Sequence, residues 1–158
     1  MIDYIVFDNK KCNKEDIAKF ILEQDKMFSV PLSERIDIKK FIEKIVSKAI
    51  IIKAVSKNDI IAMSAFYAND QVNFKSYLTF LAVDNRYRNN GIANNLIDIM
   101  FDVLKEKEML SVELTTGISN IAARRLYEKK GFKLIETYGE RVRYKYILDK
   151  EKCEWIYF

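Results

Sequence analysis

Two hydrophobic periods alternate along the chain and divide it into helices and strands. Apolar residues recur at helical spacing in four segments, whereas seven shorter segments are continuous or alternating and rich in β-branched and aromatic residues. The predicted helices are 13–28, 37–49, 92–104 and 120–130. The predicted strands are 3–8, 49–55, 60–68, 72–83, 111–116, 131–138 and 141–148.

The order of these elements predicts an α/β (α+β mixed) fold. Polar turns at 56–59 and 69–71 separate the central strands, which is typical of an antiparallel meander. The strand–helix–strand order across 78–116 requires a crossover and therefore a parallel pair. We expect one domain, 1–158, with a twisted mixed sheet of about seven strands and helices on both faces.

Composition and charge make the chain an ordinary globular protein. It is 49% hydrophobic and 32% charged, with a formal net charge of +4. The lysines are scattered, so no nucleic-acid partner is expected. Apolar runs such as 49–52 are too short to span a bilayer, and the N-terminus lacks a basic leader. We therefore expect a cytoplasmic protein without a membrane partner.

The chain contains no histidine, which excludes Ser/His, Cys/His and histidine–metal chemistry. Cys12 and Cys153 lie near opposite ends without Cys-x-x-Cys spacing, so we expect free thiols and no metal site. Any proton transfer must use tyrosine, a carboxylate, lysine, cysteine, a terminus or water.

The segment RYRNNGIA, residues 86–93, joins a strand to a helix. The first N–H groups of a helix lack internal partners and carry positive partial charge, so such a bend can bind an anion, best a phosphate. Gly91 permits a positive φ or close approach of a ligand, and Arg88 adds a fixed charge. The alternative is an ordinary loop in which Gly91 only eases the turn.

Two motifs within residues 78–135 closely resemble the GNAT superfamily of acetyl-CoA-dependent N-acetyltransferases. The first, R-x-x-G-x-A, comprises Arg88, Asn89, Asn90, Gly91, Ile92 and Ala93. The second, N-x-x-A-x-x-L-Y-x-x-x-G-F, comprises Asn120, Ala123, Leu126, Tyr127, Gly131 and Phe132.

The resemblance implies a binding mode for acetyl-CoA as co-substrate. The family's first motif holds the pyrophosphate, here residues 88–93. The preceding strand is expected to splay from 111–116, so that Leu81, Ala82 and Val83 offer backbone groups to the pantetheine arm. One of these N–H groups would also polarise the thioester carbonyl. Asn120 either caps the fourth helix and touches the cofactor, or caps the helix alone.

The resemblance also implies the reaction, direct attack of a primary amine on the thioester. We expect a small-molecule acceptor; the alternatives are a protein or peptide N-acetyltransferase and a catalytically silent CoA-binding module. Tyr127 matches the family tyrosine that protonates the leaving sulfur, and a phenol is neutral at pH 7. The alternative for Tyr127 is a packed helix tyrosine.

The resemblance does not identify the general base. Residues 72–83 hold no carboxylate, where many relatives carry a glutamate. Candidates for the base are Tyr77, Glu113, Glu34 or a water chain. An acceptor amine of low pKa would need no base.

Acceptor specificity is expected in the irregular link 27–36. Phe28, Pro31, Leu32 and Arg35 are candidates to line the acceptor site, or to fill the core of a helix connection. Arg35 and Lys75 hint at an anionic acceptor. The apolar tail 153–158 either folds back onto the sheet or covers a partner subunit, so the protein is a monomer or a homodimer.

Overall fold

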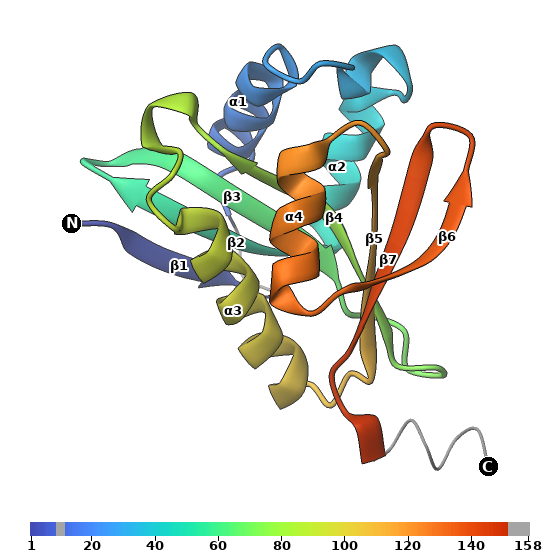
Figure 1. The fold of residues 1–158 in the computed structure, drawn as a ribbon. Coiled ribbons are helices and arrows are strands. Elements are labelled where there is room, and N and C mark those ends of the chain that lie inside the picture. Colours follow the sequence, from blue (N-terminus) through green and yellow to red (C-terminus); the bar gives the residue numbers. More distant parts are fainter. Residues whose placement is uncertain (9–11, 152–158) are drawn as a thin grey trace. The chain divides into compact units, whose positions relative to one another are not determined.

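The computed structural model describes residues 1–8 and 12–151 and contains the predicted elements (Figure 1). The helices are α1 (Lys14–Asp25), α2 (Ile38–Lys48), α3 (Ile92–Glu106) and α4 (Ile121–Lys130), with short 3-10 turns η1 (Leu32–Glu34) and η2 (Asn85–Tyr87). The strands are β1 (Asp3–Phe7), β2 (Ile50–Ser56), β3 (Asp59–Tyr67), β4 (Lys75–Val83), β5 (Ser111–Gly117), β6 (Lys133–Tyr138) and β7 (Arg141–Ile147).

The strands form a mixed seven-stranded sheet in the order β1-β2-β3-β4-β5-β7-β6. β4 and β5 are parallel, as the crossover through α3 predicted, and the flanking pairs β1–β2, β2–β3, β5–β7 and β6–β7 are antiparallel. The ladder between β4 and β5 joins 75–77 to 111–113 and ends there, although β4 continues to Val83 and β5 to Gly117. The mixed α/β fold is therefore confirmed.

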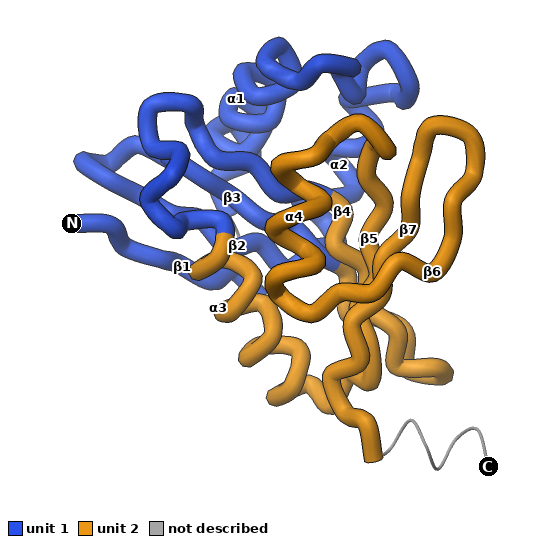
Figure 2. Tube along the Cα trace, viewed as in Figure 1, with its two compact units in different colours: residues 1–66, 80–93 blue, residues 67–79, 94–158 orange. Residues whose placement is uncertain are grey.

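The chain divides into two compact units, shown in different colours in Figure 2. The first comprises Met1–Phe66 and Phe80–Ala93. Its core joins the apolar faces of α1 and α2 to β2, β3 and the end of β4. Asn13 and Asp37 cap the two helices, because their side chains accept the N–H groups that the first helical turn leaves unpaired. Phe80 lies between Phe28 and Phe41, with ring centroids 6.3 and 6.4 Å away.

Asp25, at the end of α1, organises the link between α1 and α2. It is buried, and its carboxylate accepts the backbone N–H groups of Leu32 and Ser33. A buried carboxylate is costly unless it is hydrogen-bonded, so these two bonds fix the start of η1 against the end of α1. The link is thereby held in one conformation, although the sequence suggests an irregular segment.

The second unit comprises Tyr67–Thr79 and Asn94–Phe158. Its core is aromatic: Phe101 of α3 stacks on Tyr146 of β7 with ring centroids 4.2 Å apart, and Phe132 contacts both rings. The helical spacing of apolar positions in α3 buries Leu96, Met100 and Leu104. In this unit α3, α4 and the β5–β7–β6 strands therefore share one packed interior.

Strand β4 begins three residues later than the hydrophobic pattern predicts. Asp70 accepts the N–H groups of Val72 and Asn73 at 3.0 and 2.9 Å and so forms a turn. Phe74 then adopts a φ of 53°, which no extended strand permits. These backbone hydrogen bonds also lower the pKa of Asp70.

Cys12 is a half-buried thiol. Cys153 and the apolar tail 153–158 lie outside the described residues. Among the helices that the structure describes, none combines the length and the apolar character needed to cross a bilayer.

The role of Asp25 gives a stability prediction. Asp25→Ala leaves two partly buried N–H groups without an acceptor, so the free energy of unfolding should fall by about 1–3 kcal/mol. Urea unfolding measures the change. The control Glu23→Ala, at an exposed position of the same helix, should stay within about 0.5 kcal/mol of the parent. Equal effects of the two variants would contradict the assigned role.

Candidate active site

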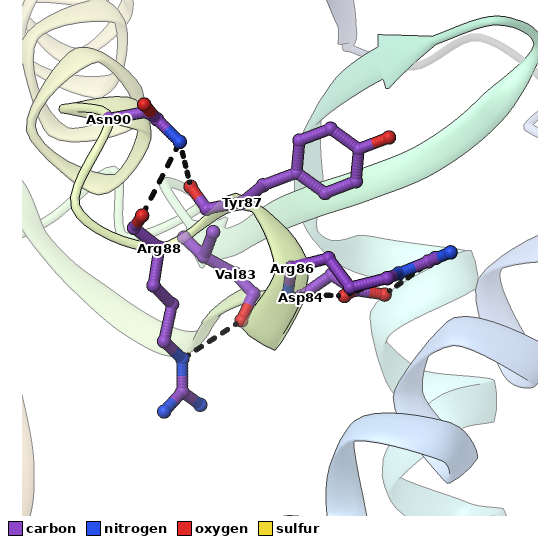
Figure 3. A network of polar contacts seen from close by, with 6 residues as sticks. All are labelled: Val83, Asp84, Arg86, Tyr87, Arg88 and Asn90. Carbon is purple, nitrogen blue, oxygen red and sulfur yellow. Dashed lines mark hydrogen bonds and ion pairs between the residues drawn. The ribbon is translucent and has the colours of Figure 1, made fainter.

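The segment between β4 and α3 is held in place by its own polar side chains (Figure 3). Asp84 caps η2 by accepting the N–H of Arg86 at 3.0 Å, and it also binds the Arg86 guanidinium through both carboxylate oxygens. The Arg86 side chain lowers the pKa of Asp84. Asn90 donates to the carbonyl oxygens of Tyr87 and Arg88 at 3.1 and 3.3 Å. The loop is thus pre-shaped by internal hydrogen bonds.

Arg88 uses only part of its guanidinium within the chain. Its Nε donates to the carbonyl of Val83 at 3.4 Å, and its terminal nitrogens extend away from the loop (Figure 3). The side chain is exposed. Because a guanidinium presents five donors, Arg88 keeps a charged fork that can bind an anion such as phosphate.

The backbone N–H groups of residues 89–92 have no hydrogen-bond acceptor within the described part of the chain. Asn89 and Gly91 have positive φ values of 65° and 73°, a conformation that turns successive N–H groups toward one side, as in anion-binding nests. A Cβ at Gly91 would meet no atom within 4 Å, so the glycine faces open space.

The end of β4 has a backbone edge suited to a ligand. The Asp84 N–H donates to Ile61 of β3 at 2.8 Å. Backbone groups alternate between the two edges of a strand, so the N–H groups of Val83 and Leu81 point to the other edge. The β4–β5 ladder ends at Tyr77 and does not reach them. Ala82, by contrast, is buried in the core of the first unit.

In the second unit, α4 begins and ends at the residues that the sequence indicates. Asn120 accepts the Ala123 N–H at 3.3 Å, and its amide reaches Thr116 Oγ1 at 3.4 Å. Gly131 ends the helix with a φ of 103°. The helix that carries Tyr127 is therefore fixed at both ends. Binding of a cofactor by Asn120 stays a prediction.

A buried tyrosine on β7 fixes the face that α4 turns inward. The hydroxyl of Tyr144 accepts from Arg124 Nε at 3.0 Å and donates to Glu128 Oε1 at 2.8 Å. Arg124 also donates to the carbonyl of Ile118 at 2.9 Å. Arg124 and Glu128 are four residues apart and share one face of the helix. Their common bond to a fully buried side chain therefore sets the rotation of α4 about its axis.

Tyr127 lies on this fixed helix with its ring buried. The ring contacts Phe132 edge-on, with centroids 5.7 Å apart, and lies 6.4 Å from the ring of Tyr144. Burial raises the pKa of Tyr127 strongly, and Tyr77 adds a smaller electrostatic contribution in the same direction. Among the described residues, no hydrogen bond uses the Tyr127 hydroxyl. The phenol is a neutral donor that has a proton available.

The second unit contains a cavity of about 420 Å³. It is lined by Lys75, Tyr77 and Glu113, three of the residues that the sequence singled out. Tyr77 and Glu113 are register partners in the β4–β5 ladder, at the point where that ladder ends. The structure thus brings the two candidate bases together, and Tyr77 also acts electrostatically on Tyr127.

Sequence reasoning missed the other six residues that line this cavity, among them Tyr67, Tyr138 and Arg143. Tyr67 ends β3, Tyr138 ends β6, and Arg143 lies on β7. Burial raises the pKa of Tyr67. The sequence shows only that polar and aromatic residues lie at the ends of several strands. The strand order is needed to show that these residues lie in one place.

The predicted acceptor residues of the link 27–36 have other surroundings. Phe28 and Leu32 are partly buried and pack against the core of the first unit. Arg35 and Glu34 are exposed at the end of η1. Packing gives Phe28 and Leu32 a structural role, and their role in acceptor binding stays a prediction. Within the described residues, no group of acidic or cysteine side chains could hold a metal ion.

Comparison with known proteins identifies the class to which this loop and fold belong. The model of the acetyltransferase (GNAT) family matches residues 17–132, well over half of the chain. The chain belongs to the GNAT acetyltransferase family, whose co-substrate is acetyl-CoA. The match includes the loop 88–93, Asn120 and Tyr127.

Curated relatives resemble a shorter stretch of the chain. N-alpha-acetyltransferase 30 of Saccharomyces cerevisiae is 38% identical over 61 residues, which is 39% of this chain and 35% of that protein. Its Homo sapiens counterpart is 41% identical over 58 residues, 37% of this chain and 16% of that protein. The matched stretch thus spans about a third or less of these relatives.

Solved structures resemble the chain over almost its whole length. A GNAT-family acetyltransferase from Staphylococcus aureus Mu50 has a TM-score of 0.74 at 22% identity, with 94% of this chain and 100% of that chain covered. At this identity the likeness shows the fold alone. The NatC complex bound to Gag peptide and CoA has a chain with a TM-score of 0.65 at 25% identity, with 92% and 96% covered.

The loop geometry predicts the effect of charge at Gly91. Gly91→Glu places a carboxylate beside the unused N–H groups of residues 89–92, so the Kd for acetyl-CoA should rise at least about a hundredfold, equivalent to about 3 kcal/mol. Isothermal titration calorimetry measures it. Gly139→Glu is a matched control, because Gly139 also has a positive φ, 57°, and faces open space.

Both variants put a side chain into a left-handed conformation and should lose about 1–2 kcal/mol of stability. Only Gly91→Glu should lose affinity. An equal Kd for the two variants would show that the loop does not bind the cofactor.

Proposed function

We propose that this protein transfers the acetyl group of acetyl-CoA to the nitrogen of a primary amine. The observation that carries the proposal is the loop 88–93, in which the N–H groups of residues 89–92 are unused within the described chain and an arginine fork lies beside them. These features suit a pyrophosphate. The backbone edge at Leu81 and Val83 suits the amide-bearing pantetheine arm, which would pair with it as a strand does.

The reaction balances without a covalent enzyme intermediate. The nitrogen lone pair attacks the thioester carbonyl carbon, the C–S bond breaks, and the sulfur leaves with the electron pair. Tyr127 then donates its proton to the CoA sulfur, or hydrogen-bonds it as charge develops. Burial raises the pKa of Tyr127, so the phenol stays protonated through neutral and mildly alkaline pH and supports the role of a hydrogen-bond donor to the developing thiolate.

The proton of the amine has two candidate acceptors, Tyr77 and Glu113. Both line the cavity of the second unit, and Tyr77 is 38% exposed. Either group can pass a proton onward to solvent, directly or through water. Many relatives carry a glutamate base on the strand that corresponds to β4. In this chain, Tyr77 or Glu113 would take the place of that glutamate.

For the acceptor we propose the α-amine of a peptide or protein. The curated relatives are named N-alpha-acetyltransferase, and one similar structure holds a Gag peptide with CoA. A small-molecule amine is the second candidate, supported by the cavity of about 420 Å³ in the second unit. The third candidate is a module that binds CoA without catalysing acetyl transfer. Acetylation of any amine would exclude this candidate.

Two measurements test the function together. Calorimetry with acetyl-CoA should show binding in the micromolar range or tighter. Release of CoA thiol should then be followed across peptide N-termini, amino acids, polyamines and amino sugars. Absence of acetyl-CoA binding by folded protein would refute the proposal, and binding without thiol release from any amine would favour the silent module.

Tyr127 gives a kinetic prediction. Tyr127→Phe keeps the buried ring and removes the donor, so kcat should fall about a hundredfold, the low end for loss of a general acid, because a thiolate is a good leaving group. The Kd for acetyl-CoA should change little. Tyr146→Phe is the control, since Tyr146 packs in the same aromatic core and should keep full turnover. Unchanged kcat in Tyr127→Phe would remove its assigned role.

A further inference from the structure

Asn90 is the only asparagine in the sequence that is followed by a glycine. In an Asn-Gly pair the backbone nitrogen of the glycine can attack the side-chain carbon Cγ of the asparagine and close a five-membered ring. A side chain on the second residue hinders this closure, and glycine has no Cβ. By covalent structure alone, Asn90 therefore carries the most reactive carboxamide of the chain.

The fold leaves this pair open to solvent. Asn90 and Gly91 are both exposed, and a Cβ at Gly91 would meet no atom within 4 Å. The Gly91 N–H has no acceptor within the described part of the chain. A nitrogen held in a helical or strand ladder would first have to break its hydrogen bond, whereas the Gly91 nitrogen is available as it stands.

The charges of the loop favour the same reaction. Attack requires that the Gly91 nitrogen lose its proton and that negative charge develop on the side-chain oxygen of Asn90. Gly91 directly precedes α3, whose N-terminus carries positive partial charge, and Arg88 adds a full positive charge to the loop. Nearby positive charge stabilises an anionic form. The features that suit a pyrophosphate thus also stabilise the anions of this reaction.

We propose that Asn90 is a site of spontaneous deamidation, and that its conversion removes the affinity of the loop 88–93 for acetyl-CoA. The Gly91 N–H gives its proton to hydroxide, and the nitrogen attacks Cγ of Asn90. The bond from Cγ to Nδ2 breaks, and Nδ2 takes a proton from water and leaves as ammonia. Water then opens the ring to aspartate or isoaspartate. One water is consumed and one ammonia released, without a change of oxidation state.

The structure shows why the product would not fit the loop. Asn90 Nδ2 donates to the carbonyl oxygens of Tyr87 and Arg88 at 3.1 and 3.3 Å (Figure 3). A carboxylate only accepts hydrogen bonds, so in place of Nδ2 its oxygen would face two carbonyl oxygens without a proton between them. It would also add a negative charge beside the unused N–H groups. Isoaspartate would further lengthen the main chain by a methylene.

The effect on affinity rests on the proposed function, and it predicts protection by the co-substrate. A pyrophosphate that accepts the N–H groups of the loop would tie up the Gly91 nitrogen and neutralise the positive charge around it. Deamidation should therefore be slow in the loaded protein and fast in the free protein. Acetyl-CoA occupancy would preserve the loop that binds it.

Peptide mapping by mass spectrometry tests the reaction. The full chain is incubated at mildly alkaline pH, and conversion of amide to acid is followed at each asparagine. Asn90 should convert at least about tenfold faster than Asn58 and Asn73, which are also exposed but are not followed by glycine. Equal rates at the three positions, or conversion of Asn90 only after unfolding in urea, would overturn the inference.

Calorimetry tests the consequence. In Asn90→Asp the Kd for acetyl-CoA should rise at least about tenfold, whereas Asn73→Asp, which adds the same charge at an exposed turn, should stay within about twofold. Circular dichroism confirms that both variants are folded. Wild-type protein aged to partial conversion should lose binding sites in proportion to the converted fraction of Asn90. Unchanged affinity in Asn90→Asp would overturn the effect on binding.

Protection links the two measurements. Acetyl-CoA at about ten times its Kd should slow conversion of Asn90 about tenfold, because only the free protein reacts, and should leave Asn73 unaffected. Binding without protection would contradict the contact between the pyrophosphate and the Gly91 nitrogen. Fast conversion of Asn90 in a chain that binds no acetyl-CoA would contradict the proposed function and leave the modification site standing.

Discussion

The early end of the ladder between β4 and β5 is the constraint on which the proposed chemistry depends. Backbone N–H and C=O groups in a sheet normally pair, and leaving them unpaired is costly away from solvent. Here the pairing stops at Tyr77 and Glu113, and both strands continue beyond it. The released edge supplies the groups that a pantetheine arm would use. The two residues at the last rung, Tyr77 and Glu113, are among those that line the cavity of the second unit.

Local signals fixed most of the fold. Asn13, Asp37 and Asn120 each precede a helical period and each caps its helix, because a short side-chain acceptor satisfies N–H groups only a few residues away. The parallel pair of β4 and β5 followed from the strand–helix–strand order across 78–116. The start of β4 was missed, since the turn at Asp70 interrupts a segment whose composition alone favours a strand.

The candidate site was predictable only in part, because local sequence patterns do not show which distant residues meet. Residues 88–93 form a contiguous motif, and Gly91 indeed needs a positive φ. Glu113 and Arg143 lie thirty positions apart and meet only because of the β5–β7 register, which no local pattern specifies. Asp25 was missed because its partners lie seven and eight residues onward in a segment without periodicity.

The chain has no histidine and no carboxylate on β4, so the proposed proton transfers must use other groups. A neutral phenol on a helix whose rotation is fixed by Tyr144 can give a proton to a leaving sulfur without itself being an ion in the core. The ion pair with Arg143 keeps the Glu113 carboxylate from being an isolated buried charge, which would be far more costly. Tyr127 of α4 and Glu113 of β5 each depend on a supporting residue of β7. These two supporting residues, Tyr144 and Arg143, are adjacent in sequence. Strand β7 therefore supports both the proposed general acid, Tyr127, and one candidate base, Glu113.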